Sequence, residues 1–339
     1  MAARVLQRLR SGVPAEQLKN PFEPRAALIY RLIAGQLVAA LALQWITGFR
    51  LPLGTLADLP FWPLFLCPSG MAARRYGHER LGGWMEATAL IYGQGVSILL
   101  VLIPLTAISG PFADSGLAAV DRALGLNWPL FVKEFEKSDK ATTAIVLFYN
   151  SFRWQPALVL SILFLLRQEN RAWMTVAAGV IAAVITAAIY PFTPALGAYT
   201  YFHVSPAAVP RFAAGWNFAP VLQAIKAGGA RTETPQMFTG LVSFPSYHAA
   251  AAAIFVWAVW PLPKIRVVFV LLNARMAVSA VVAGGHYLID IVGGLAVAAI
   301  SIRFAICRIS SRKITPECDD DKSRSPASTE ADTAATRTR

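Results

Sequence analysis

Long apolar stretches separated by shorter polar ones dominate this chain. A helix needs about 20 mostly apolar residues to cross a bilayer, and eight stretches come near that length. The stretch at 59–73 is short and contains Pro60, Pro63 and Pro68, so a re-entrant segment is its alternative interpretation. The pattern predicts an all-α, polytopic membrane bundle of about eight transmembrane helices, at residues 27–47, 59–73, 84–109, 141–166, 172–192, 246–262, 265–284 and 286–307.

The distribution of Lys and Arg predicts the orientation of these helices. With the N-terminus inside, the inner segments hold 15 basic residues and the outer segments hold 8. Cytoplasmic loops of membrane proteins carry such an excess. The outer segments at 110–140 and 193–243 are also the longer ones, and the first of them carries several acids. All eight crossings agree with a cytoplasmic N-terminus, and loss of the short second segment would break that agreement.

Composition supports a membrane protein with three regions. Apolar residues make up 56% and charged residues 15% of the 339, whereas soluble domains carry about 25% charged residues. The net charge of +12 lies in short loops and at the ends, which favours contact with anionic lipid over nucleic-acid binding. We expect a basic segment with two membrane helices at 1–83, a six-helix membrane domain at 84–307, and a disordered cytoplasmic tail at 308–339.

The first candidate for chemistry is the segment Gly284–Gly285–His286–Tyr287–Leu288–Ile289–Asp290 at the start of the last stretch. On a helix, His286 and Asp290 would share one face. A carboxylate in that position fixes the imidazole tautomer and leaves the second ring nitrogen free to react. Asp290 also lies about one turn inside an apolar helix, where an ionisable residue indicates function. The alternative is a pair that only joins two helices.

The second candidate is Ser243–Phe244–Pro245–Ser246–Tyr247–His248, which precedes a long Ala-rich run. Pro245 and Ser246 are typical of a helix start with Ser246 as the cap. The first amides and the positive dipole end of such a helix form an anion site. His248 in the first turn would face the same anion and protonate a leaving oxygen. The alternative is an interfacial histidine without a role.

Together these motifs resemble a known family. Phe-Pro-Ser-Tyr-His, followed about forty residues later by Gly-Gly-His-Tyr-Leu-Ile-Asp, is similar to the type 2 phosphatidic acid phosphatase superfamily, which also contains the vanadium haloperoxidases. The most similar branch is the inositol phosphorylceramide synthase-like (inositolphosphotransferase) branch, which has bacterial members. The stretch from Asp114 to Phe131, with Asp121 and Trp128, adds to this resemblance.

The resemblance implies a role for each motif residue. His286 would be the nucleophile that forms a phosphohistidine, and Asp290 would orient it. His248 would be the general acid, while Ser246, Tyr247 and nearby backbone amides would hold phosphate oxygens. The reaction would need no cofactor, and we expect no metal because the sequence contains no carboxylate cluster of the metal-binding type.

The sequence also departs from the family pattern. The Lys and Arg-Pro of the family's first motif are absent, Ala280 stands where an Arg usually precedes the nucleophile, and Tyr247 replaces a common Gly. Phosphoryl transfer depends on charge stabilisation, so other cations must substitute. Our candidates are Arg211 in an outer segment and Arg275, eleven residues before His286 and therefore three turns along the same helix face. Lipid contact and a buried ion pair are their alternative roles.

We therefore predict an integral membrane lipid phosphatase or phosphotransferase that acts on a phosphorylated lipid at the outer membrane face. The sequence leaves hydrolysis and transfer open, and also the oligomeric state. The resemblance implies a bacterial inner membrane protein with a periplasmic active site. Phospholipid or lipid-phosphate substrates and membrane lipids are the expected partners. A proton-coupled transporter or a non-catalytic scaffold that uses the buried His–Asp pair is the alternative from a different class.

Overall fold

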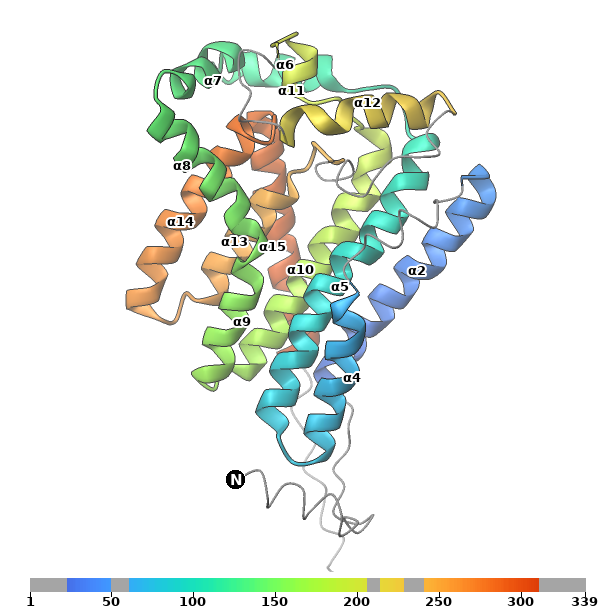
Figure 1. The fold of residues 1–339 in the computed structure, drawn as a ribbon, viewed down its shortest axis with the longest axis vertical. Coiled ribbons are helices and arrows are strands. Elements are labelled where there is room, and N and C mark those ends of the chain that lie inside the picture. Colours follow the sequence, from blue (N-terminus) through green and yellow to red (C-terminus); the bar gives the residue numbers. More distant parts are fainter. Residues whose placement is uncertain (1–22, 50–60, 206–213, 229–240, 311–339) are drawn as a thin grey trace, which may run out of the picture.

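The structure, a computed structural model, describes residues 23–49, 61–205, 214–228 and 241–310. Within these ranges the regular elements are helices, and no strand is present. Most helices run along a common axis, and four others lie across one end of the bundle that they form (Figure 1). The predicted all-α architecture is confirmed.

Five segments in the described part of the chain are long and apolar enough to cross a membrane. Their outward faces stay apolar, with Val267 and Ile300 each 57% exposed. A surface of this kind is solvated by lipid rather than by water. The chain is therefore an integral membrane protein, whose long helices are α2 (Ala27–Thr47), α5 (Glu79–Ala107), α10 (Glu169–Ile189), α14 (Pro263–Val282) and α15 (Leu288–Ser310).

The other three expected crossings are helices too short to span a membrane, or are broken into two pieces. In place of one helix at 141–166, α8 (Asp139–Asn150) and α9 (Gln155–Leu165) are separated by the 3-10 turn η3 (Ser151–Arg153), next to Pro156. The short stretch at 59–73 becomes α4 (Trp62–Arg75), and the sixth becomes α13 (Tyr247–Ala258), which ends before Pro261. Proline interrupts a helix because its ring clashes and it lacks an amide donor.

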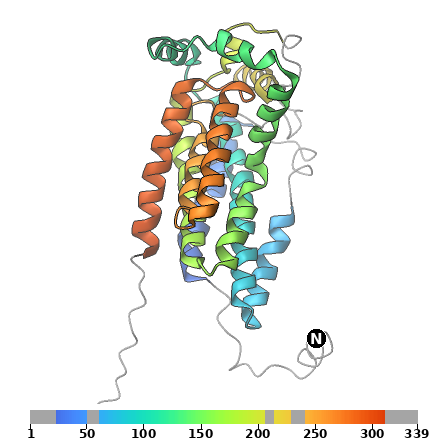
Figure 2. The same ribbon diagram turned by 90° about the vertical axis from the view of Figure 1, so that its left-hand side faces the viewer.

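Successive passes through the bundle alternate in direction. The N-terminal end of α2 and the C-terminal end of α15 lie at the same end, as Figures 1 and 2 show. Short 3-10 turns, η2 (Pro24–Ala26) and η4 (Tyr190–Phe192), flank α2 and α10. Helices α13 and α15 both begin at the other end of the bundle, and their N-termini lie near each other there.

At that opposite end four helices form what we call the cap layer (Figure 2). They come from the two long segments that the charge pattern assigns to the outer side. The cap layer consists of α6 (Asp114–Ala123), α7 (Trp128–Glu136), α11 (Ala198–Tyr201) and α12 (Ala214–Lys226). It covers the helix ends that carry both histidine motifs.

Glycines on α15 allow the first histidine motif to pack tightly. A Cβ at Gly294 would meet the main chain of Ser246 and the side chain of Ala249, and a Cβ at Gly293 would meet the ring of Phe244. In membranes small residues let helix backbones approach in this way. The pair therefore determines how closely the start of α13 lies against α15.

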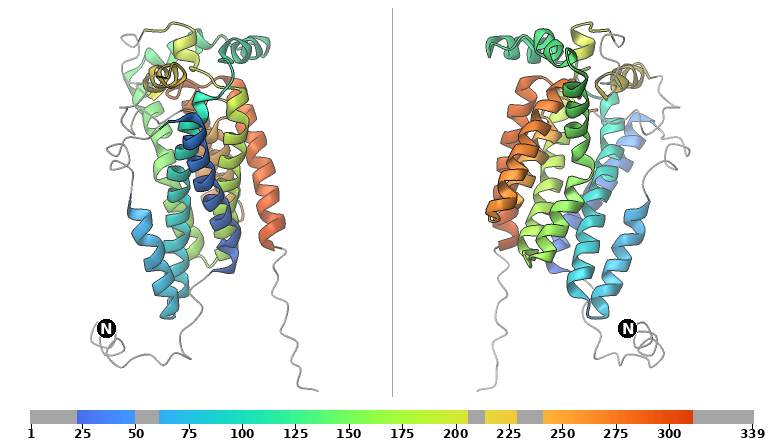
Figure 3. Two further views of the ribbon diagram at one scale, coloured as in Figure 1. Left: turned by 90° about the vertical axis from the view of Figure 1, so that its right-hand side faces the viewer. Right: turned by 60° about the vertical axis from the view of Figure 1, so that its left-hand side comes forward.

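The N-terminal helices are joined to the bundle by a buried ion pair. Arg74 of α4 pairs with Glu86 of α5, which is fully buried. The Tyr30 hydroxyl of α2 donates to the same carboxylate at 2.6 Å. Charges inside a membrane protein are expensive unless they are paired. This cluster holds α2 and α4 against α5, and Figure 3 shows α4 beside the half of α5 that is remote from the cap layer.

Candidate active site

The first histidine motif forms a turn that ends in the capped N-terminus of α13. Ser246 is the cap residue, and its Oγ accepts the amide of Ala249 at 3.4 Å. The amide of Ser246 donates to the carbonyl of Asp290 on α15 at 2.9 Å. The start of α13 is therefore bound directly to the helix that follows the second motif.

The second motif differs from its expected helical form. Helix α14 ends at Val282 and α15 begins at Leu288, so His286 lies in the loop between them rather than on a helix. Gly285 takes a positive φ of 68°, which turns the chain there and is accessible to glycine at little cost. Asp290 nevertheless reaches His286, because its carboxylate points back past the helix start and accepts the Tyr287 amide at 2.9 Å.

Two acceptors fix the imidazole of His286. Its Nδ1 lies 3.2 Å from Oδ2 of Asp290 and 3.1 Å from the carbonyl of Ser243. Since both partners are acceptors, Nδ1 carries the proton and Nε2 keeps its lone pair. Ser243 also donates its hydroxyl to Asp290 at 2.6 Å. The Nε2 atom faces Ser246, with 3.5 Å between Nε2 and Oγ. The residue is buried, with 4% of its surface exposed.

His248 lies in the first turn of α13 and faces His286. The two ring centroids are 6.1 Å apart and the rings meet edge to face. Tyr149 of α8 stacks on His248 at 4.6 Å, and Phe152 of η3 lies 4.6 Å away on a tilted plane. These aromatic contacts hold the second imidazole, so both rings reach one small space beside the α13 N-terminus.

This space is recessed into the bundle. The hydroxyl of Tyr247 donates to the carbonyl of Gly179 at 3.1 Å. Gly179 lies ten residues before Ile189, the last residue of α10, which corresponds to about 15 Å of helix. The site therefore lies below the cap layer, within the upper part of the helical bundle.

Free amide groups distinguish the α13 N-terminus as an anion site. Among the described residues, no acceptor is bonded to the amides of Tyr247 or His248. At the start of α15, by contrast, the amides of Leu288 and Ile289 donate to Asp121. An anion can therefore use the first amides of α13, together with the hydroxyl of Ser246.

The side chain of Tyr247 does not face this anion site. Its hydroxyl is bonded to Gly179, and its ring packs edge to face on Phe152, with 5.9 Å between centroids. Its main-chain amide, by contrast, has no bonded acceptor among the described residues. The expected contribution of Tyr247 to phosphate binding is thus limited to its backbone.

Of the two arginines expected to bind phosphate, the structure describes only Arg275, and it does not bring this residue to the site. Arg275 is exposed on α14, donates to the Leu271 carbonyl at 3.0 Å, and lies 5.7 Å over the ring of Phe148. It thus points toward the N-terminal end of α14, away from His286. The expected shared helix face does not exist, because the helix ends at Val282. Arg211 lies outside the described residues.

A different arginine lies near His248. Arg153 is exposed at the end of η3 and directly follows Phe152, whose ring centroid lies 4.6 Å from that of His248. The hydroxyl of Tyr92 on α5 donates to its carbonyl at 2.7 Å. Arg153 belongs to the stretch 141–166 that the sequence predicts as one membrane helix, whereas the structure places it in the break between α8 and α9.

The α6–α7 segment contributes residues that the sequence marked only by resemblance. Asp121 accepts two amides of α15, Asp114 accepts the hydroxyl of Tyr287 at 2.9 Å, and Trp128 donates to the carbonyl of His286 at 3.0 Å. Burial raises the pKa of both carboxyls, Asp114 and Asp121, and the hydrogen bonds that they accept oppose that shift. Two acids in a polar outer segment were visible in the sequence, whereas their partners were not.

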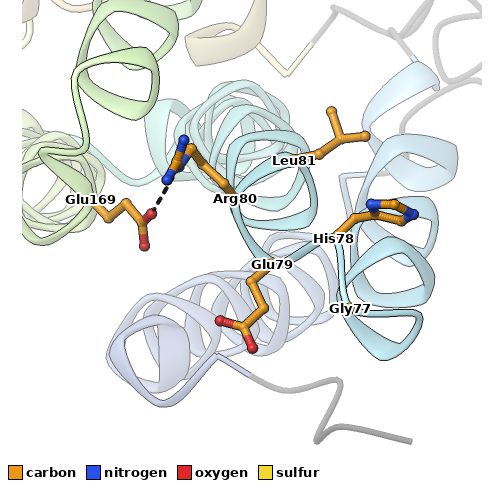
Figure 4. A pocket seen from close by; sticks show the side chains of 6 residues that line it. All are labelled: Gly77, His78, Glu79, Arg80, Leu81 and Glu169. Carbon is orange, nitrogen blue, oxygen red and sulfur yellow. Dashed lines mark ion pairs between the residues drawn. The ribbon is translucent and has the colours of Figure 1, made fainter.

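A hollow at the other end of the bundle is separate from this site. It lies between the α4–α5 turn and the start of α10, and Figure 4 shows Arg80 and Glu169 pointing toward each other there. Their closest charged atoms are 3.5 Å apart. The hollow shares no residue with the histidine motifs and is lined by Gly77, His78, Glu79, Arg80, Leu81 and Glu169.

Comparison with known proteins assigns the family. A model of the PAP2 superfamily matches residues 115–304, which is more than half of the chain. The match begins in α6 and includes both histidine motifs and the α6–α7 segment. Searches of curated proteins and of solved structures found no match. On the strength of the family match, the chain belongs to the PAP2 superfamily.

Proposed function

We propose that this protein is a membrane lipid phosphatase or phosphotransferase that transfers a phosphoryl group through His286. The observation that carries the proposal is the pair of imidazoles 6.1 Å apart, one of which has its Nδ1 held by Asp290. Members of the PAP2 superfamily are generally phosphatases or phosphotransferases. The fold is helical and membrane-embedded, which is consistent with lipid phosphatase activity.

In the proposed reaction, Nε2 of His286 attacks the phosphorus of a lipid phosphate. The N–P bond forms as the P–O bond to the lipid alcohol breaks, and His248 gives its proton to the departing oxygen. Asp290 stabilises the imidazole, which carries positive charge as the bond forms. The amides of Tyr247 and His248 and the hydroxyl of Ser246 bind the non-bridging oxygens, where negative charge is concentrated.

The second half of the reaction reverses these roles. His248, now neutral, accepts a proton from water or from the alcohol of a second lipid, and the resulting oxygen attacks the phosphohistidine. The N–P bond breaks and His286 returns to its initial state. Water yields a phosphatase and a lipid alcohol yields a phosphotransferase. The resemblance to the inositol phosphorylceramide synthase-like branch favours transfer.

A cation is needed beside these neutral donors, because a phosphate carries more charge than a helix end can stabilise. Arg153 fits this need better than Arg275. Arg153 directly follows Phe152, whose ring lies 4.6 Å from that of His248, whereas Arg275 is bonded to its own helix. We therefore assign phosphate binding to Arg153 in place of Arg275, and retain Arg211 as a candidate from sequence alone.

We further propose that the site opens toward the non-cytoplasmic side, which in a bacterium is the periplasm. The distribution of basic residues supports this orientation. The ends of α2 and α15 that are remote from the cap layer adjoin the segments with more Lys and Arg, and such segments remain cytoplasmic. The cap layer therefore lies outside, above a site that a lipid headgroup enters from the outer leaflet.

The central experiment is acid-free quenching of purified protein after mixing with ³²P-labelled phosphatidic acid in mixed micelles. We expect a phosphoenzyme that is stable to alkali and labile to acid, as a phosphohistidine is, together with release of inorganic phosphate. His286→Gln should abolish both, with a loss of turnover of at least about 1,000-fold. Turnover that survives this substitution would exclude His286 as the nucleophile.

His248 is tested separately by the leaving group. His248→Gln should slow cleavage of phosphatidic acid far more than cleavage of p-nitrophenyl phosphate, whose leaving group needs no proton. Equal losses on both substrates would remove His248 as the general acid. Absence of phosphoryl turnover in every assay, together with uptake driven by a proton gradient, would instead support the transporter.

Labelled phosphatidylinositol with and without ceramide separates hydrolysis from transfer. A transferase produces a labelled ceramide product only when ceramide is present, whereas a hydrolase releases inositol phosphate under both conditions. Hydrolysis under both conditions would exclude the phosphotransferase that the resemblance to the inositol phosphorylceramide synthase-like branch favours.

A further inference from the structure

The loop that carries His286 is held by hydrogen bonds from distant segments. The hydroxyl of Tyr199 donates to the carbonyl of Val282 at 2.6 Å. The amide of Ala198 donates to the carbonyl of Gly285 at 2.9 Å. Trp128 Nε1 donates to the carbonyl of His286 itself at 3.0 Å. A loop lacks the regular backbone hydrogen bonds of a helix or sheet, so these bonds determine its conformation.

Asp121 binds the end of the loop where α15 begins. Its Oδ2 accepts the amide of Leu288 at 2.8 Å and its Oδ1 accepts the amide of Ile289 at 2.9 Å. The residue is 1% exposed. Both oxygens are thus used on the first two amides of α15, where a negative charge also interacts favourably with the helix dipole. A carboxylate from α6 therefore fixes the direction in which α15 leaves the loop.

Asp114 extends the same contact from the same face of α6. It precedes Asp121 by seven residues, which is about two helical turns. Its oxygens accept the amides of Leu196 and Gly197, both at 2.9 Å, and the hydroxyl of Tyr287 at 2.9 Å. Through Asp114 and Asp121, one helix of the cap layer thereby binds the three residues that follow His286 and the separate segment at Leu196 and Gly197.

We propose that Asp121 and Trp128 are positioning residues that direct Nε2 of His286 at the phosphate site, an inference that rests on the proposed function. Asp121 acts through the main chain of α15, which also carries Asp290 directly after Ile289. Trp128 acts through the carbonyl of His286. Neither side chain touches the reacting atoms, and their contribution is to keep the nucleophile within bonding distance and angle.

The test uses full-length protein and ³²P-labelled phosphatidic acid in mixed micelles. Asp121→Ala should lower kcat about 10- to 100-fold, as loss of a group supporting a catalytic residue does, and leave KM within about two-fold. Asp121→Asn keeps one acceptor oxygen and should recover part of the loss. Trp128→Phe removes the Nε1 donor but keeps a ring against Phe202, with which Trp128 stacks, and should lower kcat less than Asp121→Ala.

The matched control is Ser138→Ala. Ser138 caps α8 at the cap end of the bundle through a bond from Ala141 at 3.4 Å, and it makes no contact with the His286 loop in the described residues. Its loss should leave kcat unchanged. If kcat falls equally in Ser138→Ala and Asp121→Ala, or if KM rises equally in both variants, Asp121 is only a helix cap that stabilises the fold and the positioning role is excluded.

Hydrogen exchange provides a readout that needs no turnover. Asp121→Ala should speed exchange in peptides spanning Leu288 and Ile289 and leave the α10 peptides unchanged. Unchanged exchange there would overturn the proposed contact even if the protein proves to act on another substrate. Faster exchange with unchanged kcat on an active enzyme would overturn the positioning role alone.

Discussion

Two helices, α13 and α15, start beside the same space, and their first amides are used in opposite ways. The start of α13 is capped by its own Ser246, which leaves the amides of Tyr247 and His248 without an acceptor among the described residues. The start of α15 is sealed, in the sense that the carboxylate of Asp121 accepts hydrogen bonds from the amides of Leu288 and Ile289. One helix end is available for an anion, and the other is a structural joint.

The charges at the two ends explain this difference. A helix N-terminus carries about half a positive charge. At α15 that charge is balanced by Asp121 and by Asp290 in the first turn, whereas the first turn of α13 contains no acid. On charge alone, we therefore expect an anion to be favoured at the start of α13 over the start of α15, where the carboxylates repel it. Proximity of a helix N-terminus alone would not identify the binding end.

The largest effect expected from this comparison concerns the cation beside the open end. Arg153→Ala should lower kcat/KM for phosphatidic acid about 100-fold, because a charge-assisted bond to the phosphate is lost. Arg275→Ala is the matched control, since Arg275 also lies in a membrane stretch but bonds to Leu271. It should change kcat/KM less than about two-fold. A larger loss in Arg275→Ala than in Arg153→Ala would reverse the assignment.

Local motifs explain which parts of the site the sequence could predict. Ser246 and His248 lie within three residues of each other, and Asp290 is four residues from His286, so short-range pattern was sufficient to group them. The argument for Arg275 assumed a helix that continues through Gly284 and Gly285, whereas α14 ends at Val282 and the chain turns at Gly285. Turn geometry at consecutive glycines overrides helical counting.

Long-range pairing explains what the sequence could not supply. Asp121 is 167 residues from Leu288, and the resemblance marked its segment without indicating a partner. The fold class followed from hydrophobic length alone. The shortening of α13 and the break between α8 and α9 depend on prolines and on packing around the site, so the eight expected crossings appear as five long helices and three shorter passes.

A smaller effect is expected when one amide is removed from the open end. Tyr247 is the first residue of α13, where proline is tolerated because its missing donor makes no helical bond. Ser246 has φ −68° and ψ 114°, which is compatible with a following proline. Tyr247→Pro should lower kcat/KM about 10-fold more than Tyr247→Ala, because only the proline deletes the donor.

Tyr247→Phe separates the side chain from the backbone. It loses the bond to Gly179 and should lower stability by about 1 kcal/mol, while kcat/KM stays within about two-fold. Phosphatidic acid turnover in mixed micelles measures all three variants. Equal activity in Tyr247→Pro and Tyr247→Ala would show that the Tyr247 amide does not bind the phosphate. The difference between the two helix ends would then have no consequence for substrate binding.

The smallest effect tests the sealed end by pH. Burial raises the pKa of Asp121 above its usual 3.8, against the two amides that donate to it. The folded state then binds this proton more tightly than the unfolded state does. The corresponding stability is fully present below the unfolded pKa and is lost as the pH rises through the folded pKa. The unfolding temperature of the purified protein should thus fall by about 1–3 °C from pH 4 to pH 7 through this group.

Asp121→Asn should remove that part of the slope in a thermal scan followed by tryptophan fluorescence, since its side chain does not titrate. Asp139→Asn changes an exposed carboxyl at the start of α8 and should leave the slope as it is. An identical slope in wild type and Asp121→Asn would mean that the carboxyl of Asp121 is not sealed against α15. In that case the amides of Leu288 and Ile289 would be open to a ligand, and the contrast with α13 would rest on Asp290 in the first turn alone.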